Sequence, residues 1–137
     1  MGAVVLASVS TVGCAHYSGP IPAADIASPK LSEHGLYRAA VRTGGAPIPI
    51  GRIIGWTLHV ETAMGIPVDS ATIYVDGGMP QHGHGLPTRP VVTRALGNGD
   101  HAVEGLKFSM GGWWRIIFVV RTNAGVDTVV FNAALGK

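Results

Sequence analysis

Apolar and polar side chains alternate in short runs along most of this chain, from about residue 31 to its end. Clusters of Gly, Pro and Asp separate the runs, as turns separate the strands of an all-β protein. The pattern is clearest in 52–61, where every second residue from Ile54 to Val60 is apolar. The expected strands are, in order, about 35–42, 52–61, 71–76, 89–96, 101–108, 113–122 and 126–135.

The number and spacing of these strands predict an immunoglobulin-like antiparallel β-sandwich of about seven strands. A small barrel is the alternative arrangement, and no segment shows the periodicity of an amphipathic helix. In 113–122, alternation from Trp114 to Val120 predicts a core-facing row, which leaves Trp113 partly exposed beside Met110. The apolar residues Ile117 and Val119 on the second face indicate a central strand covered on both sides.

The chain before residue 32 has a different character. Residues 1–13 are uncharged and mostly apolar or small, with the length of a signal-peptide core and too short to span a bilayer. The segment Thr11-Val12-Gly13-Cys14 resembles the cleavage box of bacterial lipoproteins, in which the cysteine is lipidated. A frayed apolar terminus or a buried strand is the alternative interpretation.

Three prolines in 15–31 favour a flexible, extended tether. The predicted organisation is a signal-peptide-like segment with a lipobox at 1–14, a tether at 15–31 and a β domain at 32–137. Such a protein is expected in the periplasm or at the cell surface, where lipid on Cys14 would anchor it to the membrane.

Composition limits the function further. Hydrophobic residues make up 47% of the 137-residue chain and charged residues 13%, which argues against overall disorder. A net charge of +2 with scattered Arg residues predicts no nucleic-acid partner. The sequence holds no nucleophile elbow, phosphate-binding loop or Cys–His pairing for nucleophilic catalysis, so we expect a protein that is not an enzyme.

One loop carries candidate metal chemistry. Its sequence, Met79-Pro80-Gln81-His82-Gly83-His84-Gly85, places one thioether and two imidazoles within a segment rich in Gly and Pro, predicted to be neither helix nor strand. These donors suit copper better than calcium or magnesium. Residues two apart in an extended loop project to the same side, so His82 and His84 are the principal candidate ligands. Met79 and Met110 are candidate sulfur donors, and His59 and His101 are weaker candidates.

Each of these residues also has a structural interpretation. A Met at a strand end often fills a gap in the core, and the two His side chains can cap backbone groups in a tight turn. Under that interpretation the loop binds no metal and serves the fold or contacts a partner protein.

Several short segments, taken in order, resemble the YtkA-like (FixH-like) family of exported bacterial β-sandwich domains. The shared segments are Pro67-Val68-Asp69-Ser70-Ala71, the Met/His loop at 79–85, Gly99-Asp100-His101-Ala102-Val103 with Leu106-Lys107-Phe108, Met110-Gly111-Gly112-Trp113-Trp114 and Asp127-Thr128-Val129-Val130-Phe131. The resemblance implies a non-enzymatic domain outside the cytoplasm, in a family with members linked to cation transport or respiratory-oxidase assembly.

These observations predict a domain that binds copper, or another soft cation, for metal handling or oxidase maturation. The alternative is a metal-free interaction module or accessory subunit with an envelope or membrane protein as its partner.

Overall fold

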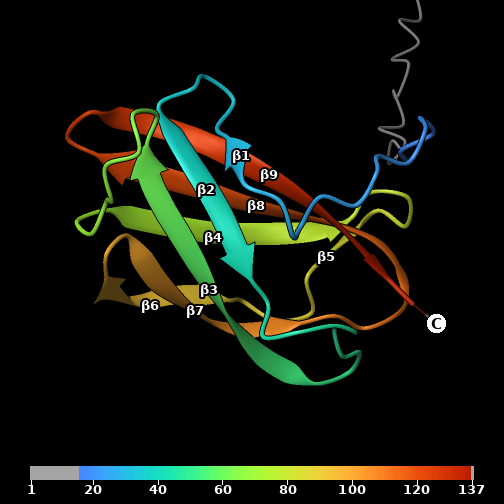
Figure 1. Cartoon of the computed structure of the whole chain (residues 1–137). Helices are drawn as coiled ribbons and strands as arrows, with labels where there is room; N and C mark the ends of the chain where they lie inside the picture. Colours follow the sequence, from blue (N-terminus) through green and yellow to red (C-terminus); the bar gives the residue numbers. More distant parts are fainter. Residues whose placement is uncertain (1–15, 137) are drawn as a thin grey trace, which may run out of the picture.

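Two antiparallel sheets make up the computed structural model, which describes residues 16–136. The first sheet contains, in spatial order, β1 (Lys30–Leu31), β2 (Tyr37–Arg42), β3 (Ile53–Thr62), β7 (Asp100–Lys107) and β6 (Val91–Gly97). The second contains β5 (His84–Gly85), β4 (Thr72–Met79), β8 (Gly112–Thr122) and β9 (Gly125–Leu135). Figure 1 shows the sheets as two facing layers, with no helix in the described part of the chain.

The connections between the strands are those of an immunoglobulin-like sandwich. One sheet joins β2, β3, β7 and β6 in the order A-B-E-D, and the other places β8 between β4 and β9 as strand F lies between C and G. The predicted fold class is therefore confirmed. The barrel alternative is wrong, because the described strands divide into two separately bonded sheets.

Alternating apolar residues fill the space between the sheets, as the sequence predicts. Trp56, Leu58 and Val60 of β3 are buried. The row from Trp114 to Val120 on β8 faces them, with every second side chain almost fully inaccessible to water. Ile117 and Val119 lie on the outer face and are only partly covered.

The inward row of β7 depends on a bulge. Opposite β3 the register shifts, so that Ile54 pairs with Leu106 but Trp56 pairs with Val103. Gly105 has φ +83, a conformation that side-chain-bearing residues rarely adopt. The extra residue turns both Val103 and Leu106 into the core, where neither is exposed.

The segment predicted as a tether contacts the sandwich over much of its length. The backbone amides of Asp25 and Ile26 donate to the carbonyl of Asn132 at 2.9 and 3.1 Å, and Lys30–Leu31 pairs with β2. The packed part of the chain thus extends to the N-terminal side of residue 32. Cys14 and the signal-peptide-like segment lie outside the described residues.

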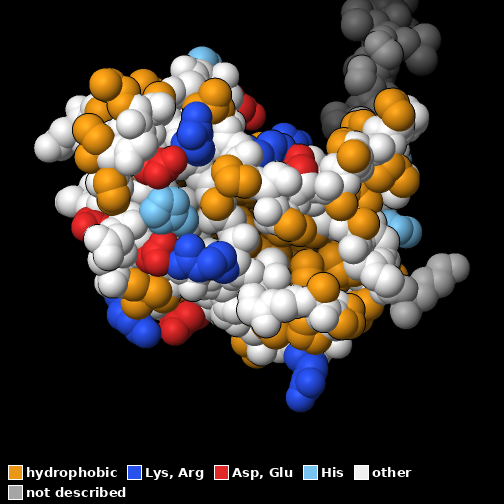
Figure 2. Space-filling view, viewed as in Figure 1, with side chains coloured by type: hydrophobic (Ala, Val, Ile, Leu, Met, Phe, Trp, Pro, Cys, Tyr) orange, Lys and Arg blue, Asp and Glu red, His pale blue; other side chains and the backbone are white. Residues whose placement is uncertain are grey.

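The two ends of the sandwich differ. In Figure 1 the turn after β4 and the first described residues lie at the right-hand end, while the β3–β4 connection and the β8–β9 turn lie at the left. Figure 2 shows hydrophobic side chains at the left-hand end and over the right-hand half of the same face.

Candidate functional site

The Met/His loop is a tight hairpin between β4 and β5. Met79 pairs with His84, and Gly78 with Gly85. Within the turn, the amides of His82 and Gly83 both donate to the carbonyl of Met79 at 3.0 Å. The expectation that the segment contains no strand is wrong at both ends: β4 continues to Met79, and His84–Gly85 form β5.

Glycine at position 78 permits this close pairing. A Cβ on Gly78 would lie 2.4 Å from the carbonyl oxygen of His84 and 2.9 Å from the Cα of Gly85, closer than any side chain allows. The backbone of β5 therefore approaches β4 only because this position has no side chain. The same approach carries His84 to the edge of the core.

The imidazoles of His82 and His84 face one another at the surface. Their ring centres are 5.9 Å apart and their planes are tilted by 33°. Both residues are exposed. The Nδ1 atom of His84 lies 3.1 Å from the carbonyl oxygen of Gly85, so this nitrogen donates its proton there and leaves Nε2 as the nitrogen with a free lone pair.

This ring separation allows both residues to ligate one ion. A bond of about 2 Å between nitrogen and metal places each ring centre about 3 Å from the ion, so two ligating rings lie up to about 6 Å apart. The observed 5.9 Å is at the upper end of that range. Ligation of one ion would require rotation of these exposed side chains to bring two nitrogens to a common point.

Met79 lies beneath these rings, not beside them. Its side chain is 1% exposed and belongs to the hydrophobic core. The Cε methyl group packs over Gly112, 2.8 Å from where a Cβ would stand on that residue. A surface hollow of about 180 Å³ brings Met79, His84 and Arg115 to one cavity wall. The Met79 sulfur can therefore reach an ion at the surface only after a local rearrangement.

Met110 lies at the same end of the sandwich and is 42% exposed. Its carbonyl accepts a hydrogen bond from Trp114 Nε1 at 3.0 Å, and the Trp114 ring lies edge-on to His84 with 5.7 Å between centres. Trp114 thus connects the backbone of Met110 to the histidine hairpin, while the Met110 thioether remains accessible.

Trp113 is buried, not partly exposed as the alternation predicts. It is 5% exposed, and its Nε1 donates to Asn132 Oδ1 at 3.0 Å. Tyr17 covers the indole edge-on with 5.0 Å between ring centres. The prediction fails because it treats residues before 32 as a tether, whereas Tyr17 packs on the outer face of the sheet.

The start of the described chain also brings a residue to the loop that sequence reasoning missed. His16 Nε2 lies 3.7 Å from where a Cβ would stand on Gly83, between the two loop histidines. The only signal in the sequence is a third His near the N-terminus, and no periodicity connects it to the loop.

The two weaker His candidates lie in the other sheet and have other partners. His59 Nδ1 is 2.8 Å from Asp100 Oδ1, and its Nε2 is 3.4 Å from Glu61 Oε2. Burial raises the pKa of Asp100, but hydrogen bonds from Arg42 and His59 outweigh that effect and lower it overall.

His101 is buried, with its Nε2 2.7 Å from the carbonyl oxygen of Val68.

His34 belongs to a hydrogen-bond cluster around Asp127. This buried carboxylate accepts bonds from Ser32 Oγ at 2.6 Å, from the backbone and Nδ1 of His34, and from the amides of Leu36 and Thr128. Burial opposes ionisation, but these donors outweigh it and hold the pKa of Asp127 well below its usual range. The cluster fixes the β1–β2 connection to β9 and is structural.

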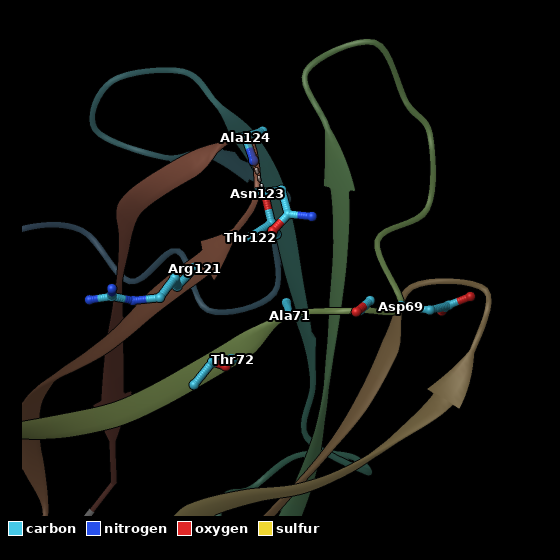
Figure 3. A pocket seen from close by; sticks show the side chains of 8 residues that line it. Asp69, Ala71, Thr72, Arg121, Thr122, Asn123 and Ala124 are labelled. Atoms are coloured by element: carbon cyan, nitrogen blue, oxygen red, sulfur yellow. Dashed lines mark hydrogen bonds between the residues drawn. The ribbon is translucent and has the colours of Figure 1, made fainter.

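Two larger hollows lie at the opposite end of the sandwich. One, of about 640 Å³, is lined by Asp69–Thr72 and Arg121–Ala124, and in Figure 3 Arg121 points away from Asp69. The other, of about 560 Å³, is bordered by the apolar side chains of Leu36, Met64 and Ile66. Both are open surface depressions without a cluster of metal ligands, so the smaller hollow beside His84 is the better candidate site.

Within residues 16–136, no three His, Cys, Asp or Glu side chains already stand at metal-binding distance from a common point. The same residues include no helix long and apolar enough to cross a membrane.

Comparison with known proteins identifies the family. No curated protein matches the sequence. The family model described as YtkA-like matches residues 50–119, which span strands β3 to β7, the Met/His hairpin and most of β8. Because this match covers half of the chain and includes the hairpin, the chain belongs to the YtkA-like family.

Proposed function

We propose that this protein is a non-catalytic binding domain that holds copper, or another soft cation, at His82 and His84 outside the cytoplasm. The observation that carries the proposal is the pair of exposed imidazoles whose ring centres are 5.9 Å apart. Imidazole nitrogens suit copper and zinc, and neutral His is their most common protein ligand.

The hydrogen bond from His84 to Gly85 supports this role. Ligating histidines usually donate the N–H of the nitrogen that does not bind the metal to a carbonyl or carboxylate, which fixes the orientation of the ring. His84 Nδ1 has such an acceptor at 3.1 Å, and the Trp114 ring limits the positions that His84 can adopt.

Sulfur would distinguish copper from zinc. Thioethers favour Cu(I), and among residues 16–136 Met110 is an accessible methionine at this end of the molecule, whereas Met79 is buried in the core. We propose that Met110 can supply the soft donor, and that Met79 does so only if the hairpin opens. The likeness to FixH-like proteins extends the proposal to copper handling during respiratory-oxidase maturation, in an exported protein anchored by lipid on Cys14.

The proposal is tested by titrating the purified chain with Cu(I) and Cu(II). Replacing both His82 and His84 with Ala should weaken binding by about 100-fold or more, because both principal ligands are lost. His34→Ala is the matched control, since it removes an exposed imidazole from a different part of the surface. Met110→Leu should weaken Cu(I) more than Cu(II). Equal, weak binding by the parent and the double variant would reject the metal site.

A metal-free interaction module is the second candidate. The apolar depression bordered by Leu36, Met64 and Ile66 favours it, because Met64 is 90% exposed and monomeric proteins rarely present such side chains together. The partner would be an envelope or membrane protein. Recovery of one defined membrane protein with the parent chain, lost with Met64→Ser/Ile66→Ser and unaffected by a chelator, would support this function over the first.

A further inference from the structure

The first described residues form part of the wall around the histidine hairpin. Tyr17 donates its backbone amide to the carbonyl of Pro80 at 3.3 Å, and its ring packs on Trp113. The Tyr17 hydroxyl donates to the carbonyl of Pro20 at 2.7 Å, which holds this short stretch in a bend. The Nε2 atom of His16 is thereby placed 3.7 Å from where a Cβ would stand on Gly83, the residue between His82 and His84 in the sequence.

A second set of contacts holds the same segment further along. Asp25 accepts a hydrogen bond from the Asn132 amide at 2.7 Å and another from Asn132 Nδ2 at 3.1 Å. Lys30 Nζ lies 2.5 Å from the Asp25 carboxylate and 2.7 Å from the carbonyl oxygen of Val130. Partial burial of Asp25 opposes ionisation, but the bonds from Lys30 and Asn132 lower its pKa overall. Residues 16–31 are therefore attached to the sheet at both ends.

Asn132 connects this attachment to the loop. Its backbone and side-chain nitrogens bind Asp25, and its Oδ1 accepts from Trp113, the indole that Tyr17 covers. The two attachments share one β9 residue, so the position of His16 is tied to the body of the sandwich. A free tether would give His16 no defined place relative to His82.

From these contacts we infer that His16 is a third imidazole ligand of the metal site, recruited when an ion binds to His82 and His84. The inference rests on the proposed function. His16 is exposed, and its Nε2 is 3.7 Å from the Cβ position of Gly83. Ligation would require the His16 side chain to change its rotamer so that a nitrogen is directed toward the ion. Three imidazoles with one open position form a common ligand set for zinc and copper.

Recruitment of His16 also couples metal binding to the docking of residues 16–20. The ion would hold the segment on the hairpin, and the docked segment would strengthen ion binding by the same factor.

The test uses the full chain, with the segment that carries His16 left intact. Cu(II) is titrated into the parent, His16→Ala, and two controls: Ser18→Ala in the same segment and His34→Ala elsewhere on the surface. Only His16→Ala should weaken binding, by about tenfold or more. Pulsed EPR of the Cu(II) form should detect three imidazoles in the parent and two in His16→Ala.

The possible results separate the two proposals. If the parent and His16→Ala bind Cu(II) equally with two imidazoles each, the role of His16 is rejected while the site at His82 and His84 stands. If the parent binds no better than the variant lacking both loop histidines, the proposed function fails and this inference fails with it.

Discussion

The histidines of this protein fall into two groups that differ in their neighbours. His34, His59 and His101 each direct a ring nitrogen to a protein acceptor, as His84 also does, but none of the three makes a ring contact with another imidazole of residues 16–136. His82 and His84 instead lie ring to ring at the surface, with His16 next to the glycine between them. Exposure alone does not separate the groups, because the His34 side chain is also exposed.

The comparison indicates that the groups next to an imidazole, as well as its exposure to solvent, determine whether it is available to bind a ligand. Around His59 the two carboxylates already have cationic neighbours, because Arg42 pairs with Asp100 and Arg38 lies near Glu61. A metal ion there would compete with resident guanidinium groups. At the hairpin the hydrogen-bond partner of the His84 ring is the Gly85 carbonyl.

The largest expected effect concerns Asp127, the hydrogen-bond partner of His34 in the first group. Asp127→Asn places an amide NH₂ among donors that now bind a carboxylate, and should reduce the free energy of unfolding by about 3 kcal/mol, since bonds to a buried charge are lost. Urea denaturation of this variant measures the loss. Glu33→Gln is the control, because Glu33 is an exposed acid in the connection between β1 and β2. An unchanged unfolding free energy for Asp127→Asn would contradict the structural role of the hydrogen-bond cluster around Asp127.

The same carboxylate predicts a pH dependence of stability. Because its pKa is lowered by folding, its contribution is complete above the unfolded value of about 4 and is lost as the pH falls below that value. Asp25 and Asp100 shift in the same direction and add to the effect. The parent should lose stability progressively below about pH 5, and Asp127→Asn should lose less over that range.

A smaller effect is expected for His59→Ala. Its pairs with Asp100 and Glu61 are partly exposed, so unfolding should become easier by about 1 kcal/mol or less, with no change in copper affinity. Chemical denaturation and a parallel copper titration measure both quantities. Weaker copper binding in this variant would break the division between the two groups.

The smallest effect concerns Arg115, an exposed cation in the hollow beside His84. Arg115→Gln removes a positive charge near the proposed ion and should tighten Cu(II) binding about two- to fivefold at low ionic strength, with less effect at high salt. Calorimetric titration at two salt concentrations measures the difference. Arg121→Gln, on the same strand but at the opposite end, should leave the affinity unchanged.

The sequence predicts the sandwich well because burial follows its alternation. The rows in β3 and β8 are confirmed residue by residue, since central strands have one face against the core. The two-residue strands β1 and β5 carry too few positions to show any period. The Gly105 bulge is also invisible to alternation, because it breaks the period that alternation depends on.

The candidate site is predictable only in part, for a related reason. His82 and His84 are near in sequence, so a turn is enough to bring them together. The places of Met79 and His16 depend on contacts between distant segments: Met79 packs over Gly112, and the segment with His16 docks through Tyr17 on Trp113. No local pattern encodes such pairings.

The hairpin and the apolar depression of Met64 and Ile66 lie at opposite ends of the long axis of the sandwich. If the proposed ion binds at the hairpin, it would leave the apolar depression uncovered. The two proposed functions therefore make use of separate surfaces, and a variant at one end can be tested without altering the other.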